Sequence, residues 1–353
     1  MLILALDLGS TCRKSTKTFA TLLNTEGGEV RRTSVPTTPD GLLGLHRTYQ
    51  PDRVVLEQTS STGWVVDIFR AANVLDIQVV NPRDEAWRNR STKTDRHDAD
   101  LLAKLSATDQ VRTVHVPETR VRQWRCLIGL REEIVRQRTR AKNHVKALLR
   151  AQGLPAGAGL WTAEGAAHLA TLAKPIAECT ANELWRGALR MALDRLAEAT
   201  AHRTAITKRL DRLVDDCPMA KVMTALPGIG PRAAEQIAAT LDDPRRFATR
   251  RQVGAYIGAV PKVSQSGGTL RHGGITKAGN PSARGVLTQI VHAAIHRNTP
   301  WIADIYHHLR RNDKTRGMRA VQGTVRRILV IMWAKCRDHR RAHPNDQLLN
   351  ANA

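Results

Sequence analysis

About the first hundred residues alternate short apolar runs with turns and amphipathic stretches, a pattern that leaves few folds open. The apolar runs are bounded by turn residues and predict strands, whereas the amphipathic stretches predict helices. Three strands followed by strands that alternate with helices indicate an α/β domain with a mixed sheet. The predicted strands are Leu2–Leu8, Phe19–Asn24, Glu29–Val35, Arg53–Glu57 and Ile77–Val80, and the predicted helices are Asp40–Tyr49, Gly63–Ala72 and Asp84–Ala107.

The rest of the chain is predominantly helical in pattern. Pro117–Ala151 and Asn182–Val214 have the apolar spacing of two long amphipathic helices, which predicts an antiparallel pair or a coiled coil. The intervening Gly153–Pro175 has a weaker pattern, and a helical segment with glycine-rich interruptions runs from Pro218 to about Arg340. The predicted domains are therefore 1–112 (α/β), 113–218 (helical spacer) and 219–342 (C-terminal), with a flexible polar tail at 343–353.

The charge of the chain restricts its partners. Lysine and arginine number 55 against 32 acids among 353 residues, a net charge of +23. Such a surplus disfavours a free-standing metabolic enzyme and predicts a polyanionic partner, because basic side chains release counterions condensed on phosphates. Nucleic acid is the first interpretation and an anionic membrane surface the second. Aromatic residues make up only 4%, which disfavours a single-strand binder built on stacked bases.

Several other classes of protein are not expected. No apolar run approaches the roughly 18 residues of a transmembrane helix, and the N-terminus lacks the basic region of a signal peptide. The five cysteines are scattered without a Cys-x-x-Cys pair, which favours reduced thiols over disulfides or a zinc ribbon. These features predict a soluble, cytoplasmic protein that contacts nucleic acid.

Four acids of the α/β domain are candidate metal ligands. Asp7 ends the first predicted strand and Glu57 the fourth, while Asp95 and Asp98 lie three residues apart on one helical face. Carboxylates that converge on Mg²⁺ can activate a nucleophile and stabilise a leaving oxygen in phosphodiester chemistry. Taken singly, each acid is more often a turn former, a helix cap or part of a solvated face. The combination in one domain favours a site for Mg²⁺, with Mn²⁺ as an alternative ion.

The C-terminal segment contains two glycine-rich motifs. Gly228 and Gly230, in ALPGIGPRAAEQIAA, have the arrangement of a helix-hairpin-helix, in which helix N-terminal amides face a phosphate oxygen; a plain turn between helices is the alternative. Ser266 precedes Gly267-Gly268 in a region with four basic residues, namely Lys262, Arg271, Lys277 and Arg284. Cationic groups could activate a serine and stabilise a phosphoryl transition state, but the spacing alone indicates only a flexible polar loop.

The motifs LALDLG, VVLEQTSSTGWV and KTDRHDADLLAKL resemble the N-terminal domain of the DEDD transposases, the recombinases of the bacterial insertion sequence 110 family. FATRRQVGAYIGAVP, QSGG and ITKAGNPSARGVL resemble the C-terminal domain of the same family. The resemblance implies a ribonuclease-H-like (RuvC-like) N-terminal fold, with Asp7, Glu57, Asp95 and Asp98 as the acidic tetrad and Ser266 as the nucleophile. The segment Gly9–Lys14 departs from the Gly-Lys-x-x-His expected after the first acid.

The resemblance also implies a function. The expected protein is an insertion-sequence transposase that joins target and donor DNA through a phosphoserine link and a junction intermediate, in a composite site within or between subunits. It implies a homo-oligomer (dimer or tetramer), an element-encoded guide RNA and a prokaryotic, nucleoid-associated location. Three alternatives remain: a DNA invertase of the same chemistry, a metal-dependent Holliday-junction resolvase in which Ser266 has no covalent role, and a non-catalytic nucleic-acid-binding protein.

Overall fold

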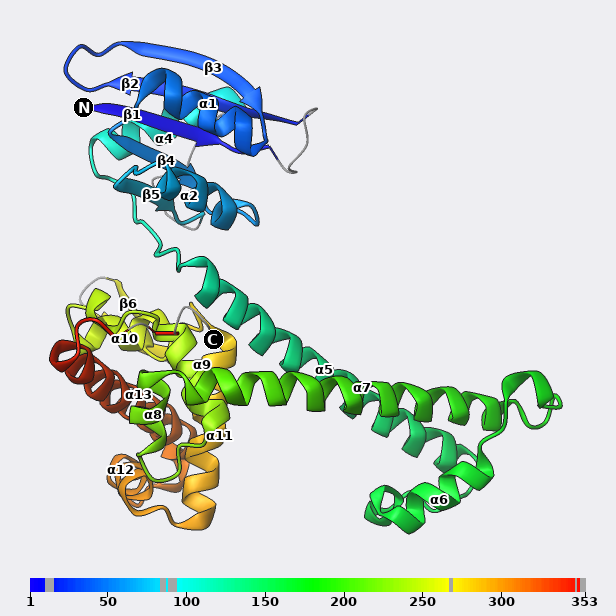
Figure 1. The fold of residues 1–353 in the computed structure, drawn as a ribbon. Helices are drawn as coiled ribbons and strands as arrows, with labels where there is room; N and C mark the ends of the chain where they lie inside the picture. The colour runs from blue at the N-terminus through cyan, green and yellow to red at the C-terminus, as the bar shows by residue number, and fades with distance from the viewer. Residues whose placement is uncertain (10–15, 83–86, 88–93, 267–268, 347, 350–353) are drawn as a thin grey trace. The chain divides into compact units, whose positions relative to one another are not determined.

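A computed structural model describes residues 1–9, 16–82, 87, 94–266, 269–346 and 348–349. The chain divides into two compact units, unit 1 (Met1–Thr119) and unit 2 (Arg120–Ala353), each with its own hydrophobic core (Figure 1). The predicted helical spacer from Arg120 onward and the predicted C-terminal segment belong to unit 2, whereas the first seven residues of the predicted spacer belong to unit 1. In the described part of the chain, no helix is both long and apolar enough to cross a membrane.

Unit 1 contains a five-stranded mixed sheet of order β3-β2-β1-β4-β5. β1 (Leu2–Asp7) pairs antiparallel with β2 (Lys17–Asn24) and parallel with β4 (Arg53–Glu57). β2 pairs antiparallel with β3 (Val30–Pro36), and β4 pairs parallel with β5 (Asp76–Val80). The structure confirms the predicted α/β domain with a mixed sheet, and it is consistent with the ribonuclease-H-like fold that the resemblance implies.

Helices cover both faces of this sheet. α1 (Pro39–Tyr49) and α2 (Thr62–Ala71) lie on one face, where they share a core with Leu4, Leu6, Val54 and Leu56. α4 (Asp95–Ala107) lies on the other face, where Leu102 and Ala103 pack with Ile3, Ala5 and Val55. Odd and even strand residues thus serve different layers, as the pleat of a strand requires. Most of the predicted helical stretch before Asp95 (83–86 and 88–93) lies outside the described residues.

Unit 2 begins with two long antiparallel helices, α5 (Thr119–Ala151) and α7 (Leu184–Asp215). Arg131 Nε donates to Thr207 Oγ1 at 3.4 Å, and Arg138 Nε donates to Thr200 Oγ1 at 3.3 Å. The second contact lies seven residues further along α5 and seven residues back along α7, so the two helices run in opposite directions. Beyond these contacts, a small core joins the end of α5, the 3₁₀ turn Ala158–Trp161, α6 (Ala163–Leu172) and the start of α7. A second 3₁₀ turn, Ile176–Glu178, contacts α7 outside this core.

The remainder of unit 2 packs around its last helix, α13 (Gly317–Ala342), whose buried face includes Val325, Ile328, Leu329 and Met332. The helices that contact α13 are α8 (Pro218–Thr224), α10 (Arg250–Tyr256), α11 (Pro281–Arg297) and α12 (Pro300–Arg310), together with the 3₁₀ turns Pro244–Arg246 and Lys314–Arg316. α9 (Pro231–Leu241) packs against α7, α8 and α11. Leu349, in the predicted polar tail, is only 4% exposed and joins this core.

One segment of unit 2 differs from the helical expectation. Residues around the predicted glycine-rich interruption form an antiparallel hairpin of β6 (Pro261–Ser266) and β7 (Thr269–Ile275). The segment lacks the apolar spacing of a helix, and adjacent glycines favour the two-residue turns that connect hairpin strands. Gly267 and Gly268 themselves lie outside the described residues.

A buried carboxylate connects α9 to the long helices. Glu235 is 2% exposed, and its Oε2 lies 3.0 Å from Nη1 of Arg232, which also pairs with Asp211 on α7. Burial raises the pKa of Glu235 to about 7, although the charges of Arg232 and Arg131 act in the opposite direction. Burial disfavours the charged form of Arg131 on α5 as well, and for this base the effect is a lowered pKa. This cluster therefore contributes a pH-dependent term to the stability of unit 2.

We expect the wild-type protein to lose stability relative to Glu235→Gln as pH rises from about 5 to about 8. The pKa of Glu235 is about 7 in the folded state against an ordinary value of 4.5 for a solvent-exposed glutamate, so the folded protein holds this proton more tightly. The stability that this tighter proton binding contributes is fully present below pH 4.5 and is lost as pH rises through about 7. Urea unfolding should show the variant gaining about 2–3 kcal/mol on the wild type over this range. An unchanged difference would contradict the assignment.

Candidate functional site

Parallel pairing brings two of the predicted acids to one edge of the sheet. Leu6 and Leu56 are partners in the β1–β4 register, and Asp7 and Glu57 follow them directly. Neighbouring strands lie about 4.8 Å apart, so the backbones of these two acids are adjacent. Two residues earlier, Ala5 and Val55 belong to the core beneath α4. Asp7 and Glu57 are therefore directed to the α4 side of the sheet.

The other two acids lie in the first turn of α4. The side chain of Thr94 caps this helix, because its Oγ1 accepts a hydrogen bond from His97 N at 3.3 Å. Asp98 is only 5% exposed and precedes the buried Leu102 by one helical turn, so it faces the sheet, whereas Asp95 is exposed. The partial positive charge at a helix N-terminus stabilises negative side chains, so it stabilises the carboxylates of Asp95 and Asp98 in this turn.

The orientation of α4 places these acids beside the first pair. α4 packs against β1, β2 and β4. At its far end, Arg53 Nη1 donates to the carbonyl of Ser106 at 2.8 Å, which fixes the C-terminus of α4 beside the start of β4. The N-terminus of α4 consequently lies toward the carboxyl ends of β1 and β4.

A pocket at this edge is shared by acids from both pairs. Its volume is about 790 Å³, and Asp7 and Asp95 both line it. The lining also includes residues that were not predicted from the sequence. These are the exposed Lys17 at the start of β2 and three hydroxyl-bearing residues after β4, namely Thr59, Ser60 and Ser61. For the three hydroxyl-bearing residues, a position soon after a strand that ends in the candidate ligand Glu57 could have indicated a place at the site. Thr62 fixes this loop, since its Oγ1 accepts from Thr59 N at 2.7 Å.

The donor set at this edge is suited to a divalent ion. Carboxylate and hydroxyl oxygens are the ligands that Mg²⁺ and Mn²⁺ prefer. The four acids lie on one side of the sheet, but their carboxylates are not grouped closely enough to form a complete set of metal ligands. Among the described residues, the side chains that are grouped in this way are His339, His343 and Asp346 in unit 2. The sequence resemblance implies a divalent metal ion, and the residues at this edge fit one by their chemistry and their location.

Asp100 provides an internal contrast to Asp95 and Asp98. It accepts hydrogen bonds from Thr21 Oγ1 at 2.7 Å and from Arg32 Nε at 3.0 Å, on the neighbouring strands. Partial burial acts to raise the pKa of Asp100, but hydrogen bonds from Arg32 and Thr21 hold it below its usual value. Asp100 thus fastens α4 to β2 and β3, away from the pocket.

The predicted nucleophile lies on the hairpin of unit 2. Ser266 is the last residue of β6 and pairs in register with Thr269, while Ser264 pairs with Arg271. Of the predicted basic residues, Lys262, Arg271 and Lys277 are exposed. Arg284 has a supporting part instead: its Nη1 donates to the carbonyls of Ile257 at 2.6 Å and Gly279 at 3.3 Å, which fastens α11 to the loops beside the hairpin.

The two predicted glycines connect α8 to α9. Gly228 has φ +84°, a left-handed conformation that favours glycine, and a Cβ there would lie 3.3 Å from the Thr299 side chain. Trp301 Nε1 donates to the carbonyl of Pro227 at 2.8 Å, which holds the turn against α12. Gly230 occupies the N-cap of α9 in extended conformation, with no side-chain cap.

Two family models match the chain. The first, a transposase model for DEDD proteins of the IS110 type, matches residues 14–152, and the second, "Transposase IS116/IS110/IS902 family", matches residues 220–307. The first range contains Glu57, Asp95 and Asp98 and begins after Asp7. The second contains Ser266 and the α8–α9 turn.

Named relatives agree with these matches. The chain is 29% identical over 209 residues to a probable family 20 transposase of Pseudomonas aeruginosa, covering 57% of this chain and 58% of the relative. It is 27% identical over 226 residues to the transposase for insertion sequence element IS1111A of Coxiella burnetii, covering 62% and 58%. A putative transposase of Sinorhizobium fredii, y4pF/y4sB, is 27% identical over 55% of this chain and 49% of its own length. The chain thus spans about half the length of these relatives.

We expect Asp95→Asn and Asp98→Asn to weaken Mn²⁺ binding by about 100-fold, because loss of a ligand costs at least as much as loss of its outer partners. Asp100→Asn is the matched control, since it changes the same helix on a different face and should leave Mn²⁺ affinity unchanged. Isothermal titration with Mn²⁺ measures all three. Equal affinity in Asp98→Asn and wild type would remove Asp98 from the metal site.

Proposed function

The chain belongs to the IS110 family of transposases, and on that premise we propose that it is an insertion-sequence transposase that cuts and rejoins DNA. The observation that carries the proposal is the edge of the unit 1 sheet, where Asp7 and Asp95 line one pocket and Glu57 and Asp98 face the same side. The four carboxylates come from two strands and one helix that are far apart in the sequence. A nuclease-type metal site explains why they share one edge.

In this proposal, Asp7, Glu57, Asp95 and Asp98 hold Mg²⁺, or alternatively Mn²⁺, which when bound would neutralise charge developing on the phosphate oxygens. The exposed ammonium of Lys17 on the pocket wall is available to a non-bridging phosphate oxygen. The hydroxyls of Thr59, Ser60 and Ser61 can donate hydrogen bonds to phosphate oxygens of the same DNA backbone. The pocket volume of about 790 Å³ admits a nucleotide-sized group.

We propose Ser266 as the nucleophile. Its oxygen would form a bond to phosphorus while the bond from phosphorus to one deoxyribose oxygen breaks, and the serine proton passes to a base or water as the deoxyribose oxygen leaves as a hydroxyl. A DNA hydroxyl would later attack the phosphoserine, restoring the serine and rejoining the strand. The exposed Lys262 and Arg271 on the hairpin would stabilise the added charge on phosphorus.

Other parts of unit 2 are proposed to hold nucleic acid. We propose that α8, the Gly228–Gly230 turn and α9 act as a helix-hairpin-helix that contacts a DNA phosphate, a role supported by the left-handed Gly228 and by Gly230 at the N-cap of α9. Lys277 is exposed nearby in sequence, while Arg284 would act indirectly by fastening the adjoining loops. The net charge of +23 supports a second polyanion, an element-encoded guide RNA. Pairing of α5 and α7 as a coiled coil is proposed on their apolar spacing, and a dimer or tetramer is proposed on the family resemblance.

Two readings compete with this one on the same residues. A DNA invertase would use the same chemistry in another genetic context. A Holliday-junction resolvase would use the acids with an activated water, and Ser266 would be dispensable. The place of Ser266 at the end of β6, in a hairpin that also contains the exposed Lys262 and Arg271, supports the covalent mechanism.

We expect Ser266→Ala to bind DNA normally yet form no covalent adduct and perform no strand exchange, because alanine has no oxygen to bond to phosphorus. Denaturing gels with end-labelled DNA should show a shifted band for the wild type that protease treatment collapses. Ser264→Ala is the matched control on the same strand and should keep the band.

Each other result selects a different mechanism. An adduct that survives in Ser266→Ala places the nucleophile elsewhere, with Ser264 next to test. Metal-dependent nicks without any adduct in the wild type select the resolvase. Binding without nicks or adducts selects the non-catalytic protein.

We also expect binding to DNA or RNA to depend steeply on salt. If about 6–10 phosphates are neutralised, affinity should fall about 10³–10⁵-fold between 50 and 200 mM salt, because each counterion released from the phosphates gains less entropy in a more concentrated solution. Fluorescence anisotropy with a labelled duplex across this range measures the slope. A nearly flat response would show that the surplus of basic residues has another purpose.

A further inference from the structure

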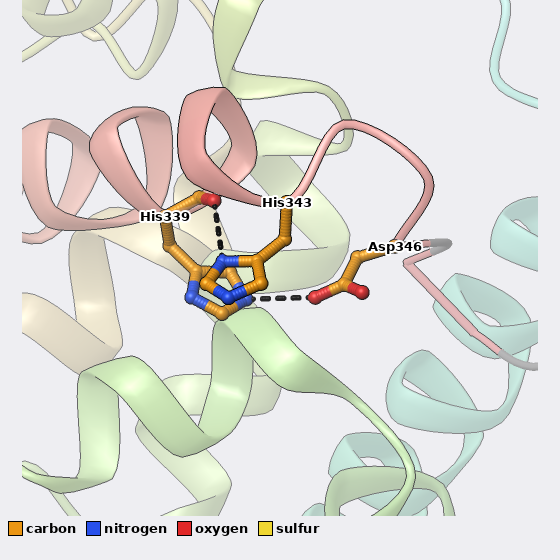
Figure 2. Close-up of side chains that lie close together, drawn as sticks. All are labelled: His339, His343 and Asp346. Atoms are coloured by element: carbon orange, nitrogen blue, oxygen red, sulfur yellow. Dashed lines mark hydrogen bonds and ion pairs between the residues drawn. The ribbon is translucent and has the colours of Figure 1, made fainter.

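The end of α13 gathers two imidazoles and a carboxylate that the proposed function does not use. Figure 2 shows the side chains of His339, His343 and Asp346 converging from the last turn of the helix and the segment after it. One ligand atom from each lies within 4.8 Å of the others. We propose that this cluster, the tail cluster, binds a transition-metal dication of the Zn²⁺ class.

Local structure explains why these three residues meet. His339 and His343 are four residues apart, so they share one helical face, and their rings stack with centroids 4.5 Å apart. Pro344 cannot continue the helix, and the chain turns back with Asp346 N donating to the carbonyl of His343 at 3.2 Å. This turn brings Asp346 Oδ2 to 2.9 Å from His339 Nε2.

The hydrogen bonding of His343 prepares it as a ligand. Its Nδ1 lies 3.1 Å from the carbonyl oxygen of His339, and because a carbonyl only accepts, Nδ1 must carry the hydrogen. With Nδ1 occupied by this hydrogen bond, Nε2 is the ring atom left to bind a metal. Metal-binding histidines characteristically donate their other ring N–H to a carbonyl or carboxylate, which fixes tautomer and orientation.

The donor set selects the class of metal. Two imidazole nitrogens and one carboxylate oxygen suit Zn²⁺ and its neighbours in the first transition row, whereas Mg²⁺ prefers oxygen ligands alone. The side chains of His339 and Asp346 are 23% and 34% exposed, so an ion can reach them and a water can complete the coordination. Binding would replace the proton between His339 Nε2 and Asp346 and release it to solvent.

The tail cluster lies where a metal would hold the end of the chain. Asp346 precedes Leu348 and Leu349, which pack against the core of unit 2. Arg120 Nη1 also donates to the carbonyl of Leu349 at 2.8 Å, which connects this segment to the start of α5. A bound ion would therefore fasten the chain between α13 and its last core residue, a structural part distinct from the acids of unit 1.

The test uses the full-length protein, freed of metal with a chelator and titrated with Zn²⁺ in excess Mg²⁺, which competes for the carboxylate site. Calorimetry should detect one tight Zn²⁺ equivalent that is weakened about 100-fold or more in His343→Ala and in Asp346→Asn. His296→Ala, at an exposed histidine of α11, is the matched control and should bind as the wild type does. Circular dichroism confirms that each variant is folded.

Thermal unfolding gives a second readout. At a free Zn²⁺ concentration about 100 times the dissociation constant, the midpoint of wild type and His296→Ala should rise by about 5–10 °C, and that of His343→Ala should not. Failure of the wild type to bind Zn²⁺ in excess Mg²⁺ would overturn the proposal. So would Zn²⁺ affinity that stays unchanged in both cluster variants, or that falls equally in His296→Ala.

Discussion

The parallel pairing of β1 with β4 is the constraint on which the site depends. Because Leu6 pairs with Leu56, the acids that follow them, Asp7 and Glu57, come to one edge and one side of the sheet. A shift of one residue in this register would direct one acid to the opposite layer, where α1 and α2 pack. The buried alternation of Leu4 and Leu6 against Ile3 and Ala5 prevents that shift, so hydrophobic packing fixes the position of the charged groups.

α4 depends on the same layer. Its apolar stripe, Leu102 and Ala103, packs on Ala5 and Val55, and this packing brings Asp98 to the sheet at 5% exposure. Burial of a carboxylate is costly unless charge or hydrogen bonds compensate it. The position at a helix N-terminus contributes to this compensation, and a divalent cation in the proposed metal site would add to it. The packing that stabilises α4 on the sheet therefore also positions Asp98 for the proposed metal site.

Unit 2 uses its charged residues differently. Glu235, Arg232 and Asp211 connect α9 to α7, and Arg284 fastens the loops beside the β6–β7 hairpin through backbone carbonyls. Some of the basic residues that give the chain its net charge of +23 therefore serve packing, and the exposed ones, such as Lys262, Arg271 and Lys277, remain available to a polyanion. Net charge alone does not distinguish these two groups.

The sequence by itself determined the α/β domain, all five strands of its sheet and both long helices, because each follows from a local period of apolar residues. It also singled out the four acids by their places at strand ends and on one helical turn. Tertiary structure alone decided that Asp7 and Asp95 share a pocket with Lys17 and Ser60, that Glu235 is buried, and that Asp346 turns back to His339. These contacts depend on the register of distant strands, the packing of one helix on another and the path of a turn, none of which a local period of apolar residues specifies.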